Sequence, residues 1–121
     1  MSAVKLSNPQ IRLMLKMLLH EREVQARAHA AGNKVPLVVA YAPRGQQGLS
    51  VTATSLERKD MVHVVRVGIN REFDGAWLRP KGREVIADIL HNDDCWLAYA
   101  KRLAMQSPPT WRVPNAFDEF G

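Results

Sequence analysis

The sequence predicts an α+β domain with a long N-terminal helix, a small antiparallel sheet and a C-terminal helical extension. Three observations lead to this prediction. Residues 8–31 carry apolar side chains at three- and four-residue spacing, which is typical of a helix with a buried face. Residues 61–78 contain two short β-prone runs around a polar turn, the pattern of a hairpin. Pro80 then opens a second apolar-periodic region, as expected at a first helical position.

The composition indicates one soluble globular domain. A chain of 121 residues, 46% hydrophobic and 24% charged, can bury a single core. No apolar run approaches the roughly 18 residues that a membrane span needs, and the N-terminus lacks a hydrophobic signal core. We therefore expect a cytoplasmic protein without a membrane partner. The single cysteine, Cys95, excludes an internal disulfide and fits a reducing compartment.

The charge balance favours an anionic partner. The chain has 17 Lys+Arg against 12 Asp+Glu, a net charge of +5. Beyond Met105 the charged residues are Arg112, Asp118 and Glu119; that net of −1 leaves +6 on residues 1–105. Such a bias places duplex nucleic acid first among candidate partners. Because many small proteins are basic without this role, an ordinary basic surface remains an alternative.

The first helix has recognisable ends. Ser7 or Asn8 can cap it, and Pro9 suits the first helical position. Gly32, followed by asparagine, is a suitable C-terminal stop. A helix of this length exceeds the globular average, so a break near His20 is an alternative.

Residues 35–41 are short, continuous and β-branched, so we expect a strand there, with Pro36 at its start or on an edge. Residues 43–48 are predicted to form a loop. Ser50 would cap a helix over residues 51–60.

The hairpin is expected to consist of strands 61–67 and 76–78 around a tip at 70–75, with Asp74-Gly75 as the turn. After the helix that begins at Pro80, the polar run 92–94 can cap a final helix. That helix is expected to turn four side chains inward: Trp96, Tyr99, Ala100 and Leu103.

Two phrases in residues 49–90 resemble the winged-helix proteins of phages and bacteria. The first is Leu56-Glu57-Arg58-Lys59-Asp60-Met61-Val62, at a helix end before a wing. The second, Leu78-Arg79-Pro80-Lys81-Gly82-Arg83-Glu84-Val85-Ile86, follows the wing. With a similar first-helix entry at residues 6–12, the likeness covers about 50 of the 121 residues. It implies a winged-helix-like domain over residues 1–106, whose usual partner is duplex DNA, and a Pro/aromatic tail over 107–121.

The chain departs from that family pattern at three points. Arg79 stands where the family has a capping Thr, and arginine cannot accept a hydrogen bond from helix N–H groups. Asp60 stands where a glycine usually ends the recognition helix. No separate helix precedes residues 51–60, so either residues 24–31 take that part or the helix-turn-helix is degenerate.

The candidate DNA-binding residues share outward positions on helix 51–60 or positions around the wing. Ser and Thr can bond base edges or phosphates, and Arg and Lys supply charge and bidentate guanine contacts. A solvated helix face and ordinary surface charge are the alternatives. The residues are Ser50, Thr52, Thr54, Ser55, Arg58 and Lys59 on the helix, and Arg66, Arg71, Lys81 and Arg83 around the wing.

No cofactor or catalytic activity is predicted. His91 and Cys95 stand four residues apart, but a zinc site needs further ligands that the sequence does not supply at matching spacing. We expect Cys95 to be a buried thiol beside Trp96, without a metal. No nucleophile triad, phosphate loop or dinucleotide fingerprint is present.

Three aromatic residues in the tail leave two alternatives open: Trp111, Phe117 and Phe120 either dock on the domain or bind a partner protein. The expected function is non-enzymatic duplex-DNA binding, as a small transcriptional regulator or phage accessory factor. The alternative is a phage-encoded inhibitor or adaptor of a host nucleic-acid machine, of the anti-CRISPR kind, that binds a host protein. Both of these functions are compatible with a homodimer.

Overall fold

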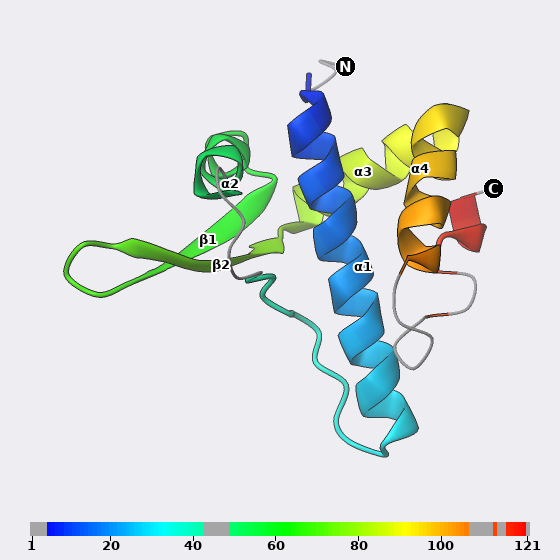
Figure 1. The fold of residues 1–121 in the computed structure, drawn as a ribbon, viewed down its shortest axis with the longest axis horizontal. Helices are drawn as coiled ribbons and strands as arrows, with labels where there is room; N and C mark the ends of the chain where they lie inside the picture. Colours follow the sequence, from blue (N-terminus) through cyan, green and yellow to red (C-terminus); the bar gives the residue numbers. More distant parts are fainter. Residues whose placement is uncertain (1–4, 43–48, 107–112, 114–115, 121) are drawn as a thin grey trace.

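The computed structural model describes residues 5–42, 49–106, 113 and 116–120. In this part the chain is α+β, with four helices, a two-stranded antiparallel sheet and a short 3-10 turn (Figure 1). In chain order these are α1 (Asn8–Ala30), α2 (Leu49–Arg58), β1 (Val62–Val67), β2 (Glu72–Leu78), α3 (Pro80–Asn92), α4 (Asp94–Met105) and η1 (Asp118–Phe120).

Helix α1 is the central element of the fold. In Figure 1 the hairpin and α2 lie on one side of α1 and α4 lies on the other, while α3 passes behind α1 from the end of β2 towards α4. The buried apolar side chains of α1 lie in its first half, and Met14 and Leu15 are fully buried because neighbours cover the helix on several sides. The β1–β2 hairpin projects away from this body (Figure 1).

Both predicted ends of α1 are confirmed. The Ser7 hydroxyl accepts a hydrogen bond from the Gln10 backbone N–H, and the Gln10 side chain accepts one from the Ser7 N–H, which is a capping box. At the other end Gly32 has φ +72°, and the Asn33 N–H donates to the Ala28 carbonyl at 2.9 Å. The helix is continuous through His20, so the alternative of a break there is wrong.

The predicted strand over residues 35–41 is wrong. Only Tyr41 pairs with the sheet: it exchanges two backbone hydrogen bonds with Ala76, at 2.7 and 3.1 Å. The preceding residues run as irregular chain, and the Pro36 carbonyl accepts from the Gln25 side chain instead. β-branched residues favour a strand only where a neighbouring strand lies in reach, and here the chain joins β2 at a single residue.

The hairpin is longer than predicted, and its turn lies elsewhere. The tip is Gly68–Arg71, closed by a hydrogen bond from the Arg71 N–H to the Gly68 carbonyl. Asp74 and Gly75 lie inside β2, beside an irregularity in the pairing at Val65/Arg66. Gly75 has φ +155°, and a Cβ there would lie 3.3 Å from the Ala42 Cβ. This glycine therefore permits a close approach between chain segments, which local turn rules do not anticipate.

Other expected boundaries and faces also change. Helix α2 begins at Leu49, so Ser50 lies inside its first turn and is not the cap. The buried face of α4 consists of Leu97, Ala100 and Ala104, whereas Trp96, Tyr99 and Leu103 are half-buried around it. The predicted cap of α4 is confirmed, because the Asp93 carboxylate accepts from the Cys95 and Trp96 N–H groups.

Asp60 supplies the turn that a glycine would otherwise make after α2. Its φ is +62°, in the left-handed region that costs an L-residue roughly 1–2 kcal/mol. Its ion pair with Arg79 is exposed and 3.8 Å long, so it contributes little. We expect the Asp60→Gly variant to be about 1 kcal/mol more stable than Asp60→Ala in urea unfolding, because only glycine relieves the strain. Equal stabilities would contradict this account.

Candidate nucleic-acid interface

The polar side of α2 is largely used to hold the fold together. Ala53 and Leu56 are fully buried, as predicted. The Ser55 hydroxyl accepts from Gln10 Nε2 at 2.8 Å and donates to the Thr52 carbonyl. Lys59 Nζ donates to the Lys5 carbonyl at 2.8 Å and to Gln10 Oε1 at 3.0 Å. These contacts attach the end of α2 to the start of α1.

A second group of predicted contacts joins α2 to the hairpin. The Thr54 hydroxyl donates to the Ser50 carbonyl at 2.7 Å and accepts from an Arg66 guanidinium nitrogen at 3.1 Å. Arg66 also forms an ion pair with Glu57 at 3.1 Å. Glu57 in turn accepts from the Val64 backbone N–H. Arg66 is therefore already paired within the fold.

Arg83 serves a buried carboxylate. Its two terminal nitrogens each lie 2.6 Å from an oxygen of Glu21, in the two-pronged geometry typical of arginine–carboxylate pairs. The Glu21 side chain is only 5% exposed. Because a buried carboxylate needs a partner, Arg83 is already engaged in this contact.

Three of the predicted cations remain exposed: Arg58, Arg71 and Lys81. Their side chains have no hydrogen bond or ion pair to the rest of the described chain. Arg71 stands at the hairpin tip, away from the core. Thr52 is half-buried and Ser50 is exposed.

Arg58 and Lys81 belong to a group that we call the basic corner, which involves three chain segments: the end of α2, the residues just before α1 and the start of α3. The contact of Lys59 with the Lys5 carbonyl and the hydrogen bond from the Arg79 N–H to the Met61 carbonyl bring these three chain segments together. Asp60 is the carboxylate within this group, beside Arg79. The basic corner consists of Lys5, Arg58, Lys59, Arg79 and Lys81.

Sequence reasoning missed two members of the basic corner. Lys5 precedes the first helix, and only the Lys59 contact shows that it lies beside α2. At Arg79 the sequence indicates only a residue that is unsuited to cap α3. It indeed makes no capping hydrogen bond, but its side chain is 48% exposed and adds a cation. Its unfavourable capping chemistry was the one available signal that the residue serves another purpose.

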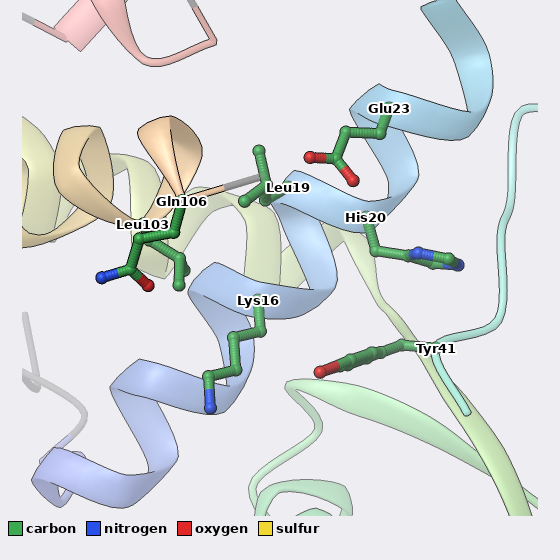
Figure 2. Close-up of a pocket in the computed structure, with 7 residues that line it drawn as sticks. All are labelled: Lys16, Leu19, His20, Glu23, Tyr41, Leu103 and Gln106. Atoms are coloured by element: carbon green, nitrogen blue, oxygen red, sulfur yellow. The ribbon is translucent and has the colours of Figure 1, made fainter. Parts of the chain in front are cut away.

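A hollow of about 280 Å³ lies along α1, in a place that the sequence did not indicate. Figure 2 shows its lining: Lys16 and His20 from α1, Tyr41, and Gln106 at the end of α4. The His20 and Tyr41 rings are 5.5 Å apart. Tyr41 and Gln106 lie on opposite sides of α1 (Figure 2). Ligand pockets usually have polar groups that converge on one point. The polar side chains around this hollow do not converge, so it does not have the form of a ligand pocket.

The aromatic residues at the end of the chain dock on the domain. Phe117 is 1% exposed and belongs to the core, and Phe120 packs against that core. The Arg22 guanidinium lies 5.6 Å from the centre of each ring. Arg22 also bonds the Ala116 carbonyl and pairs with Glu119. Of the two alternatives, Phe117 and Phe120 therefore follow the first, because both pack on the domain. Trp111 lies outside the described residues.

The expected burial of Cys95 is wrong, because its side chain is exposed. It occupies the first turn of α4, on the side opposite the buried Leu97. The ring of its spaced neighbour His91 packs edge-on against Phe120 at 5.1 Å. Within the described ranges, no three His, Cys, Asp or Glu side chains lie close enough to hold a metal ion together.

The described helices include none with the length and apolar character required to cross a bilayer. Searches of protein-family models, of curated protein sequences and of solved structures found no match to this chain.

Proposed function

We propose that this protein binds duplex DNA through the phosphate backbone, using the basic corner and the hairpin tip. The observation that carries the proposal is that two elements each provide an exposed cation without an ion pair in the described chain. These cations are Arg58 at the end of α2 and Lys81 at the start of α3. Unpaired exposed cations retain their full charge for a phosphate partner, and phosphate neutralisation supplies most non-specific DNA affinity.

The shape of the hairpin supports a second point of contact. Its strand β1 has six residues, which span about 20 Å at the usual rise of a strand. Arg71 therefore stands well away from the basic corner. The major groove is about 12 Å wide, so the basic corner and the tip can reach phosphates on both sides of one groove.

The internal contacts of α2 favour backbone binding over base reading. Ser55 and Lys59 are held by Gln10, and Thr54 is held by Arg66. Base-specific recognition needs free side chains that reach base edges, and on this helix Arg58 is the clearest one. The resemblance to winged-helix proteins, together with the order of helix, hairpin and helix, supports a role as a small regulator or phage accessory factor with weak sequence preference.

The first test of this function is a charge-matched comparison. Arg58→Ala/Lys81→Ala should weaken binding to a fluorescein-labelled 30-base-pair duplex, measured by anisotropy over a salt series. Two lost phosphate contacts should reduce the slope of log K against log salt by about 1.8. The control is Lys34→Ala/Arg102→Ala, which removes two exposed cations outside the basic corner.

The two variants have the same net charge, so they separate a local site from a diffuse charge effect. Equal losses in both would show that overall charge alone attracts DNA. An unchanged salt slope in the Arg58/Lys81 variant would reject the basic corner as the site.

A further inference from the structure

An apolar slot lies between residues 37–38 and the junction of β2 with α3. It has a volume of about 430 Å³. Leu37 is 84% exposed and Val38 is 52% exposed, although large apolar side chains this close together are usually covered. They face the slot together with Trp77 and Pro80.

The slot exists because the predicted strand leaves the sheet. From the Tyr41–Ala76 bridge, continued antiparallel pairing would set Val39 opposite Leu78. No such pairing forms among residues 35–42. Alternate residues of a strand direct their backbone groups to the same side, so Leu78, like Ala76, directs its N–H and C=O away from β1. The part of β2 that is left unpaired on this side is Leu78, which lines the slot but is itself only 3% exposed.

The aromatic floor of the slot is of the kind that anchors protein partners. The rings of His63 and Trp77 stack at 4.5 Å between centroids, and Trp77 is only half-buried. Tryptophan is over-represented among the residues that dominate binding energy at protein interfaces. An apolar side chain inserted beside Leu37 would cover this ring.

The charges around the slot define what can enter it. His63, Arg79 and Arg83 line it, and within the described chain none of its lining residues carries a carboxylate. Arg83 is already paired with Glu21. Arg79 at the rim meets only the exposed Asp60 carboxylate, at 3.8 Å, and such an exposed contact is weak enough to exchange for a partner's carboxylate. A second copy of this chain would bring like charges together, which is unfavourable.

We propose that the slot binds an extended segment of a partner protein with a large apolar side chain next to acidic residues. The apolar side chain would lie between Leu37 and Trp77, and a carboxylate would reach Arg79. This activity is separate from DNA binding, since Leu37, Val38 and Trp77 are not part of the basic corner. Because Arg79 belongs to both sites, an acidic partner and DNA should compete.

The first experiment is a selection from a phage-displayed library of random 12-residue peptides on the immobilised full-length protein. We expect enriched sequences to place Asp or Glu within two positions of a large apolar residue. We also expect no enrichment on the Leu37→Ser/Val38→Thr variant, whose changes are at exposed positions and should leave folding intact. Absence of enrichment on the wild type, or enrichment without acidic residues, would overturn the proposal.

The second experiment locates the selected peptide on the protein. Titration followed by ¹H–¹⁵N NMR should shift the Trp77 indole signal, and binding should weaken at least tenfold in Leu37→Ser/Val38→Thr. Val51→Ser, another exposed apolar position, should bind as the wild type does. Equal binding by all three proteins would overturn the assignment. Concentration-dependent dimerisation in sedimentation velocity, lost in the Leu37/Val38 variant, would overturn it too, by showing that the occupant is a second copy.

Discussion

Replacing Gly82 by alanine is expected to lower the free energy of unfolding by about 3 kcal/mol, at the upper end of the usual overpacking cost. A Cβ at this position would lie 2.1 Å from the Met61 carbonyl oxygen, far inside van der Waals contact. The obstacle is backbone and cannot rotate away. The same oxygen accepts from the Arg79 N–H at 3.0 Å, and the Met61 side chain is fully buried. Urea unfolding followed by circular dichroism measures the loss.

Gly68→Ala is the matched control for this prediction. Gly68 has φ +78°, and no atom lies within 4 Å of the position that an added Cβ would take, so its replacement adds only left-handed strain of about 1–2 kcal/mol. Gly82 has no positive φ, so its cost is steric alone. If Gly82→Ala proved no more harmful than Gly68→Ala, the close approach of α3 to Met61 would be contradicted.

The second large effect is expected at Arg83. Arg83→Met would leave the Glu21 carboxylate, 5% exposed, without its partner. Breaking a buried pair in this way costs about 3–5 kcal/mol; because Arg83 is itself 34% exposed, we expect about 3 kcal/mol. The measurement is urea unfolding at pH 7.

A double variant shows whether the cost comes from the stranded charge. Glu21→Met/Arg83→Met removes both charges and should be more stable than Arg83→Met alone, since two apolar residues can replace an ion pair. Arg79→Met, which breaks the exposed pair with Asp60, should change stability by less than about 1 kcal/mol. A double variant as unstable as Arg83→Met would mean that the arginine stem contributes through packing.

These two positions give a physical reason for the phrase that resembles winged-helix proteins. Gly82 allows the first turn of α3 to meet the end of the α2–β1 connection, and Arg83 neutralises a carboxylate on α1. Leu78 is buried beside them. Gly82, Arg83 and Leu78 therefore contribute to the fold, and the proposed DNA contact is assigned to neighbours such as Lys81 and Arg58. For this reason a motif-level resemblance indicates architecture more directly than activity.

Rules that act over a few residues correctly predicted the local elements. The cap at Ser7, the stop at Gly32 and the Asp93 cap each depend on atoms within about one helical turn. The apolar spacing of α1 likewise indicated its buried face. In all of these the partner atoms are near in sequence, so the sequence by itself determined the conformation.

Only the tertiary structure decided which side chains remain free. Ser55 meets Gln10 across 45 residues, and Arg83 meets Glu21 across 62. These contacts engage two of the side chains that were predicted to bind DNA, and the Lys59–Lys5 contact shows where the basic corner forms. The predictions of a strand at residues 35–41 and of a buried Cys95 were wrong for the same reason. Strand pairing and burial depend on what lies opposite in space, and a local pattern records only what a residue prefers.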